Sequence, residues 1–196
     1  LAIRKFLDWL FERGYRDTQV PHVKLFKLRN SREVVFSDNM REEVVEWQRK
    51  NAGEEYADFW YCCLRTAVRR DELFTAKPEQ LTSAGLLLTK TKNGKSRVVP
   101  LLPEVRAILE KRLPWGFTRR KLYLRLLSMR KAFGVHKTSN DFVLHTCRHS
   151  AITKMVENGV DLRSVQEIAG HSSLEQTARY AKVNPNRLIA AVESLK

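Results

Sequence analysis

The sequence predicts a mainly α-helical domain with a small antiparallel β-sheet, an α+β fold. Apolar residues recur at helical spacing in several segments, and Gly or Pro closes most of these segments. Asn93-Gly94 separates the apolar runs 86–89 and 97–99, and this dipeptide between two such runs is typical of a β-hairpin. With 43% hydrophobic residues in 196, the chain has enough apolar side chains for a sizeable core.

The first 36 residues predict a helix followed by an extended basic segment. Residues 1–13 carry apolar side chains at helical spacing, and Gly14 is the expected end of that helix. Residues 15–36 contain Pro21 and several basic residues, so they are either a linker that follows a phosphate backbone or a plain solvated tether. The chain begins at Leu1, inside the helical pattern, which indicates a piece of a longer protein.

Two helices are expected between this linker and the hairpin. Asn39 and Glu42 have the spacing of a capping box, which predicts a helix that runs to about Lys50 and is broken by Gly53. A more apolar helix is expected over about residues 55–70.

A short strand near Leu81 is expected to join the hairpin as a third strand, and helices follow it. Pro103 suits the first turn of a helix, while Gly159 and Gly170 separate later ones. The expected helices after the sheet span residues 103–112, 119–133, 146–158, 161–169, 173–181 and 185–195.

The charge of the chain indicates a polyanionic partner. The formal net charge is +14 and the isoelectric point is about 10.0. The excess is clustered: residues 111–140 hold nine basic residues and no acid, and residues 81–103 hold four and no acid. Nucleic acid is the first candidate, ahead of an anionic membrane or a merely solvated surface. The two clusters are candidate phosphate-contacting faces.

No membrane partner is expected, because no apolar run approaches the roughly 20 residues of a membrane span. Cys62 and Cys63 are adjacent and Cys147 is remote, so the cysteines have neither a disulfide framework nor a metal-binding spacing. These features predict a cytoplasmic, intracellular protein that works on DNA.

One set of residues could break and rejoin DNA without a metal. Tyr180 is a weak nucleophile by itself, with an ordinary pKa of about 10. It becomes useful when fixed cations hold the phosphodiester that it attacks. His145 and Arg148 share one face at the start of a helix, where a phosphate is favoured, and His149 lies on a neighbouring face. Further candidates for this set are Arg69, Lys92 and His171.

Two other readings compete for parts of this set. His145 and His149 have the spacing of a zinc-binding pair, but Thr146 stands where a metalloprotease needs Glu, so neither a metal nor a cofactor is expected. The segment from Asp161 to Tyr180 has the rhythm of a helix-turn-helix. A helix-turn-helix alone would leave Arg69, Lys92 and His145 without roles.

Four motifs resemble the tyrosine recombinases, or phage-type integrases. Residues 66–73 resemble the box T-G-L-R-x-x-E-L, and residues 92–101 resemble the hairpin K-G-x-K-x-R-x-V-P-L. Residues 144–149 resemble H-x-L-R-H, and residues 169–180 resemble L-G-H-S-s followed by Thr and Tyr. The motifs stand in the family's order and cover most of residues 37–185. The resemblance implies the catalytic core fold of that family.

The sequence departs from the family pattern at two positions, and its hairpin leaves one role open among three lysines. Ala67 replaces the usual Gly and Cys147 replaces the usual Leu, which affects packing more than chemistry. The hairpin carries three lysines, and the position of the Arg-Val-Val-Pro run favours Lys92, with Lys90 and Lys95 left open.

The resemblance implies a role for each residue. Tyr180 attacks the scissile phosphate, forms a 3′-phosphotyrosine link and frees a 5′-hydroxyl, so that rejoining needs neither a metal nor ATP. Arg69 and Arg148 bind the non-bridging oxygens, and Lys92 protonates the leaving oxygen. His145 assists proton transfer from Tyr180, and His171 binds the phosphate or orients its neighbours. Glu72 supports the arginine region.

The resemblance also implies an organisation and partners. Residues 1–14 would be the last helix of a truncated N-terminal core-binding domain, residues 15–36 a basic linker, and residues 37–196 the catalytic domain with a C-terminal tail helix. The expected partners are double-stranded DNA, bound weakly by this piece, and further copies in a synaptic tetramer. A tail at 184–196 would dock on a neighbouring copy or on its own domain. The first expected function is a site-specific recombinase or integrase; the alternatives are a type IB topoisomerase and a non-enzymatic helix-turn-helix protein.

Overall fold

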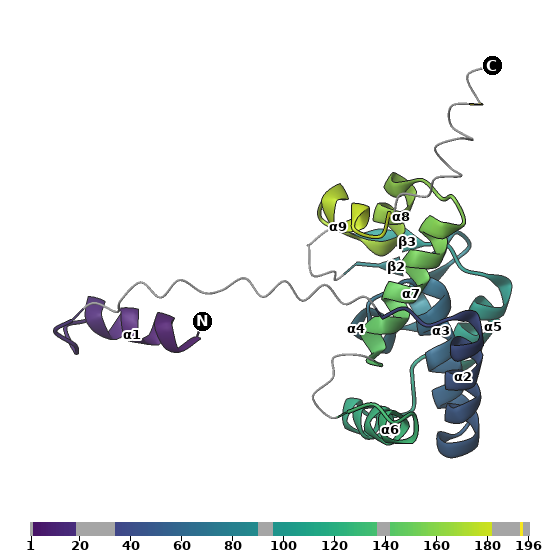
Figure 1. Cartoon of the computed structure of the whole chain (residues 1–196), viewed down its shortest axis with the longest axis horizontal. Coiled ribbons are helices and arrows are strands. Elements are labelled where there is room, and N and C mark those ends of the chain that lie inside the picture. The colour runs from purple at the N-terminus through teal and green to yellow at the C-terminus, as the bar shows by residue number, and fades with distance from the viewer. Residues whose placement is uncertain (1, 19–33, 90–95, 137–141, 182–192, 194–196) are drawn as a thin grey trace. The chain divides into compact units, whose positions relative to one another are not determined.

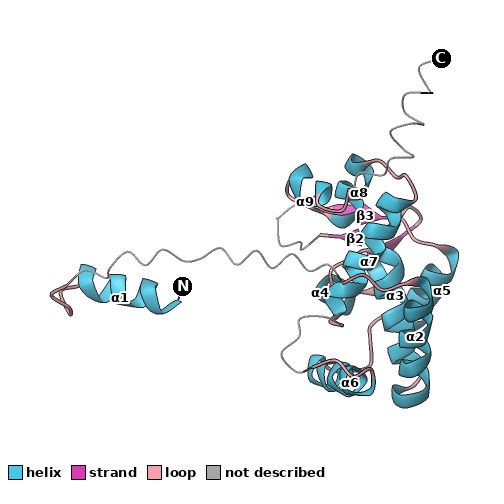
Figure 2. Ribbon diagram, in the orientation of Figure 1, coloured by secondary structure: helices cyan, strands magenta, loops and turns pink. Residues whose placement is uncertain are grey.

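The computed structural model of the chain describes residues 2–18, 34–89, 96–136, 142–181 and 193 (Figure 1). The chain divides into two compact units, Leu1–Ser31 and Arg32–Lys196. Helices dominate the larger unit, and its strands form one small sheet (Figure 2). This confirms the predicted fold class. No helix within the described ranges is long and apolar enough to cross a membrane.

The smaller unit contains helix α1 (Ala2–Glu12), which confirms the helix expected there. Gly14 follows with φ of +73°, a backbone conformation that glycine adopts at little cost. The ring of Trp9 lies 6.2 Å from that of Phe6 and 6.1 Å from that of Tyr15. All three rings are exposed.

Helix α2 (Asp38–Ala52) begins two residues earlier than the capping box suggested. The Oγ of Ser37 accepts a hydrogen bond from the amide of Met40 at 3.2 Å, so Ser37 is the N-cap and Asn39 lies inside the helix. The prediction of the cap at Asn39 was therefore wrong. Ser37 has the extended backbone and the short hydroxyl side chain that a cap needs.

Helix α3 (Glu54–Thr66) runs through the core of the larger unit. Phe59 and Trp60 are fully buried on it. It packs against α2, against α5 (Pro103–Arg112) and against α7 (Leu144–Glu157). The expected helix over 55–70 is wrong at its C-terminal end, because the backbone turns left-handed at Ala67 and helix α4 (Arg70–Phe74) starts afresh.

The sheet has three antiparallel strands in the order β1-β2-β3: Leu81–Thr82, Gly85–Leu88 and Arg97–Val99. Leu86 pairs with Val99, which confirms the hairpin pairing and the third strand. A Cβ on Gly85 would overlap the carbonyl oxygen of Val99, so the close approach of β2 and β3 requires glycine there. Asn93-Gly94 lies outside the described residues.

The other elements place the C-terminal motifs beside the sheet. Helix α8 (Leu162–Ala169) contacts β3, and α8 and α9 (Leu174–Ala178) lie at the end of the larger unit opposite α6 (Arg119–Ala132) (Figure 1). The expected helix over 185–195 falls, except for residue 193, outside the described residues. The short helix η1 (Pro78–Gln80) directly precedes β1.

Candidate active site

A left-handed alanine positions the first arginine of the site. Ala67 follows α3 with φ of 53° and is fully buried. Arg69 then returns to extended backbone just before α4. An L-residue in the left-handed region costs about 1 kcal/mol or more, whereas glycine adopts it freely. This explains why the motif that residues 66–73 resemble usually has Gly at this point.

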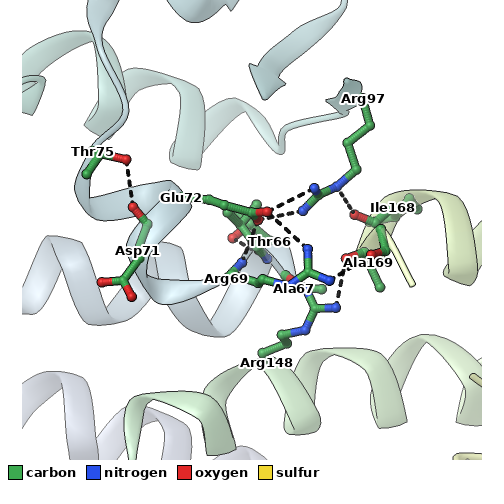
Figure 3. Close-up of polar contacts among 12 residues, drawn as sticks. Thr66, Ala67, Arg69, Asp71, Glu72, Thr75, Arg97, Arg148, Ile168 and Ala169 are labelled. Atoms are coloured by element: carbon green, nitrogen blue, oxygen red, sulfur yellow. Dashed lines mark hydrogen bonds and ion pairs between the residues drawn. The ribbon is translucent and has the colours of Figure 1, made fainter. Parts of the chain in front are cut away.

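A buried carboxylate holds two arginines together. Glu72 Oε1 accepts from Arg69 at 3.0 Å, and its Oε2 accepts from Arg97 at 2.6 Å (Figure 3). The Glu72 side chain is 8% exposed. Burial raises the pKa of this carboxyl, but the hydrogen bonds and charges of Arg97 and Arg69 outweigh burial and lower it overall. Glu72 is therefore ionised and neutralises part of the local positive charge.

Three arginines converge on the C-terminal end of α8. Three consecutive carbonyl oxygens accept one each: Ile168 from Arg97 at 3.1 Å, Ala169 from Arg148 at 2.7 Å and Gly170 from Arg69 at 2.8 Å. The last carbonyls of a helix have no partner within it and carry its negative partial charge. Gly170 itself has φ of +65°, and a Cβ there would lie 2.7 Å from the Arg97 guanidinium.

Arg148 is the most buried cation of the site. Its side chain also donates to the carbonyl of Ala67 at 2.6 Å, and the residue is 4% exposed. Burial, and then the charges of Arg69 and Arg97, lower its pKa to about 10. Arg148 stays protonated at neutral pH, and the mutual repulsion of these cations favours an anion between them.

Tyr180 lies against two histidines of the same chain. Its hydroxyl is 2.6 Å from Nδ1 of His149, and its ring stacks on that of His171 with 6.2 Å between centroids. Burial raises the pKa of the half-buried Tyr180, against the opposing charges of Arg148 and Arg179. Its hydroxyl therefore keeps its proton at neutral pH in the absence of DNA.

His171 is neutral in this site. Its Nδ1 lies 2.8 Å from Oγ1 of the buried Thr177. Burial first, and then the charges of Arg148 and Arg69, lower its pKa to about 4. Where the Thr177 hydroxyl donates to Nδ1, the ring proton sits on Nε2, which can then donate to a phosphate oxygen.

Four of the predicted site residues come together in the structure: Arg69, Arg148, His171 and Tyr180. His145 is exposed on the first turn of α7, with its ring edge-on to His149 at 4.7 Å. Lys92 lies outside the described residues, as do Lys90 and Lys95.

Two residues of this cluster had no assigned role in the sequence. His149 contacts the Tyr180 hydroxyl, and Arg97 shares Glu72 with Arg69. The available signal for both was their place inside motifs, H-x-L-R-H for His149 and the hairpin motif for Arg97. Within the described ranges, no three His, Cys, Asp or Glu side chains form a group that could hold a metal ion.

The stability of the protein should depend on pH through His171. Its pKa is about 4 when folded and 6.5 ordinarily, so the unfolded chain takes up a proton at higher pH than the folded chain. The contribution of His171 to the free energy of unfolding is therefore greatest above pH 6.5, and it is lost as the pH falls toward 4. Between these two pH values, the free energy of unfolding of wild type should fall by on the order of 1 kcal/mol more than that of His171→Gln, after allowance for partial exposure of the ring. Parallel melting curves at each pH would contradict this.

Comparisons with known proteins identify the family. The model of the phage integrase family matches residues 55–187, which is most of the chain. The chain belongs to the phage integrase family. It is 32% identical over 146 residues to tyrosine recombinase XerD of Listeria monocytogenes, covering 63% of the chain and 48% of XerD. It is 35% identical over 145 residues to XerA of Thermococcus kodakarensis, covering 66% of the chain and 51% of XerA. The chain thus spans about half the length of these relatives.

Solved structures agree with this family assignment. The catalytic domain of bacteriophage HP1 integrase superposes with a TM-score of 0.68 and 25% identity, covering 82% of this chain and 95% of that domain. XerH recombinase bound to its difH substrate gives 0.64 with 21% identity, covering 97% of this chain and 61% of XerH. The resemblance seen in the sequence motifs is therefore confirmed for the family and for its fold.

Proposed function

We propose that this integrase-family chain is the catalytic part of a site-specific DNA recombinase or integrase. It would cleave and rejoin strands through a 3′-phosphotyrosine intermediate. The observation that carries the proposal is that the Tyr180 hydroxyl shares one cluster of side chains with Arg69, Arg148 and His171. The pKa of Tyr180 responds to Arg148, and its ring stacks on His171.

The two arginines suit a phosphate in its transition state. Protein carbonyls fix the guanidinium groups of Arg69 and Arg148 before DNA arrives, so little reorganisation accompanies the reaction. Each planar guanidinium can offer further N–H donors to non-bridging oxygens. Negative charge that develops on the phosphoryl oxygens would relieve the repulsion between these cations.

Lys92 and His171 have the remaining roles in a cycle of cleavage and rejoining that conserves the energy of the phosphodiester bond. We assign Lys92 as the acid that protonates the leaving 5′-oxygen, and His171 as a donor to the phosphate. The phosphotyrosine link retains the energy of the broken phosphodiester, so the 5′-hydroxyl can reverse the reaction without ATP. The contacts of Tyr180 with His149 and His171 of its own chain favour cleavage within its own site.

Helix α6 is the proposed phosphate-contacting surface. It exposes five of the nine basic residues counted between 111 and 140, namely Arg119, Arg120, Lys121, Arg125 and Lys131. Two of these five also have internal partners, since Arg119 lies 3.5 Å from Asp71 and Arg125 donates to the carbonyl of Asn51 at 3.4 Å. Outside the five, Arg112 pairs with Asp58 at 2.6 Å, and Arg130 donates to the carbonyl of His136. Double-stranded DNA is the proposed partner, and its affinity for this chain should fall steeply with salt.

The proposed organisation follows from the family. The unit that ends at Ser31 would belong to a core-binding domain, with 1–14 as its last helix, and 37–196 would be the catalytic domain. Further copies of the chain would assemble on DNA as a synaptic tetramer. The chain alone is expected to bind DNA weakly.

A nicked suicide duplex tests the proposed function. After cleavage next to the nick, a short 5′-hydroxyl fragment diffuses away and the adduct accumulates. Mass spectrometry of the digested adduct should locate a 3′-phosphonucleotide on the peptide that contains Tyr180. DNA binding with no covalent product at high protein concentration would instead support a helix-turn-helix DNA-binding protein. Relaxation of supercoils without strand exchange would support a type IB topoisomerase.

A further inference from the structure

Arg97, at the start of β3, belongs to the cationic cluster but directs its donors toward the protein. Its Nη1 donates to Oε1 of Glu72 at 3.1 Å and its Nη2 donates to Oε2 at 2.6 Å. Its Nε donates to the carbonyl of Ile168 at 3.1 Å (Figure 3). The Arg97 side chain is 9% exposed, against 24% for Arg69. Of these two arginines, Arg69 is therefore the one that a phosphate can reach more readily.

The two arginines contact the carboxylate of Glu72 in different ways. The Arg97 guanidinium places one N–H on each carboxylate oxygen, whereas the Arg69 guanidinium contacts Oε1 alone, at 3.0 Å. The backbone amide of Arg69 donates to Oε2, and its second terminal nitrogen donates to the carbonyl of Gly170 at 2.8 Å. Arg97 thus has the two-pronged geometry that an arginine prefers on a carboxylate, and Arg69 does not.

The charge of Glu72 makes this difference important. An ionised carboxylate that is 8% exposed requires close cations. Burial raises the pKa of Glu72, and the hydrogen bond and charge of Arg97 oppose burial more strongly than the contacts of Arg69 do. Two arginines and one carboxylate leave one net positive charge. Without Arg97, the carboxylate would have Arg69 as its cation, and that net charge would vanish.

We propose that Arg97 is a positioning residue that occupies both oxygens of Glu72 and so keeps the guanidinium of Arg69 available to the DNA phosphate. Without Arg97, the second terminal nitrogen of Arg69 would turn from the Gly170 carbonyl to Oε2 and complete a two-pronged pair with Glu72. The donors and charge of Arg69 would then be directed at the carboxylate instead of the phosphate. This inference rests on the proposed function and adds to it a residue that acts through Arg69.

A second substitution that reverses the effect of the first tests this inference. Arg97→Met removes the charge, while an unbranched and flexible side chain fills the space. Single-turnover adduct formation on the nicked duplex should be about 10- to 100-fold slower than in wild type. Glu72→Gln, added to that variant, removes the charge that would capture Arg69 and restores one net positive charge. The double variant should therefore react at least about 5-fold faster than Arg97→Met.

Arg97→Lys is the conservative variant. Lysine keeps the positive charge and can donate to the Glu72 carboxylate, although it lacks the planar fork of arginine. Less of the carboxylate charge then falls on Arg69 than in Arg97→Met. The rate of adduct formation should lie between those of wild type and Arg97→Met.

Arg112→Met is the matched control for a general loss of stability. Nε of Arg112 lies 2.6 Å from Oδ2 of Asp58 in another partly buried pair, which joins α5 to α3 outside the site cluster. This substitution should also lower the melting temperature. Its rate of adduct formation should stay close to that of wild type at a temperature where every variant is folded.

The outcomes distinguish this inference from the function beneath it. A double variant that is as slow as Arg97→Met, or slower, overturns the assignment, because a merely structural pair would not be repaired by a second loss. A wild-type rate in Arg97→Met, an equal rate in Arg97→Lys and Arg97→Met, or an equal loss of rate in Arg112→Met also overturns it. Each of these results leaves the proposed function standing. A wild-type chain that forms no adduct under the same conditions overturns both.

Discussion

A Tyr180→Phe variant should bind DNA as wild type does and form no covalent adduct with it. The substitution removes only the oxygen that would bond to phosphorus. It also deletes the hydrogen bond to His149, but a net loss of about 1 kcal/mol is expected for such a bond, and both partners are partly exposed. The stacking of the ring on His171 remains possible for Phe. The fold should therefore survive, and a denaturing gel after incubation with the nicked duplex should show no shifted band.

Tyr61→Phe is the matched control for this experiment. It also removes one hydroxyl, but Tyr61 lies on α3, where the Arg65 guanidinium sits 5.0 Å from its ring, and it belongs neither to the site cluster nor to the α6 surface. It should form the adduct at close to the wild-type rate. If Tyr180→Phe retained the adduct, another side chain would be the nucleophile, and the geometric argument for Tyr180 would fail.

Local signals in the sequence predicted most of the fold. The paired strands and the helix that starts at Pro103 follow from turn and cap chemistry that acts over a few residues, and the structure contains them. The errors occurred where such signals compete. Ser37 and Asn39 are both good caps, and the choice between them depends on which has extended backbone. Helix α3 ends at Thr66 because the next residue, Ala67, adopts the left-handed backbone conformation. Alanine disfavours this conformation intrinsically. A tertiary contact accompanies it, since the Ala67 carbonyl accepts a hydrogen bond from Arg148.

The motifs predicted the members of the site but not their contacts. Arg69 and Arg148 are 79 positions apart in the sequence, yet both donate to the end of α8. The spacing of residues along the sequence does not predict that these two side chains lie close together, because their proximity results from the long-range packing of α7 and α8. Arg97 and His149 were overlooked for the same reason. A side chain next to a motif residue has no visible role until its partner from a distant segment is known.

Replacement of Arg148 should lower both the rate of adduct formation and the stability of the protein. Arg148→Ala deletes a fixed cation at the proposed phosphate site, and such contacts are worth about 100- to 1,000-fold or more in rate. It also leaves the carbonyls of Ala67 and Ala169 without their donor in a buried region. An unsatisfied buried polar group costs about 1–3 kcal/mol. Adduct formation should be at least about 1,000-fold slower, with a lower melting temperature.

Arg148→Lys separates these two effects. Lysine keeps a positive charge but presents one compact ammonium group, so it cannot span the carbonyls of Ala67 and Ala169 and still offer forked donors to a phosphate. Its melting temperature should lie between those of wild type and Arg148→Ala, because one carbonyl can regain a donor. Its rate should nevertheless remain at least about 100-fold below wild type. A lysine variant with wild-type rate would show that charge alone suffices at this position. The hydrogen bonds from the Arg148 guanidinium to the carbonyls of Ala67 and Ala169 would then stabilise the fold rather than the transition state.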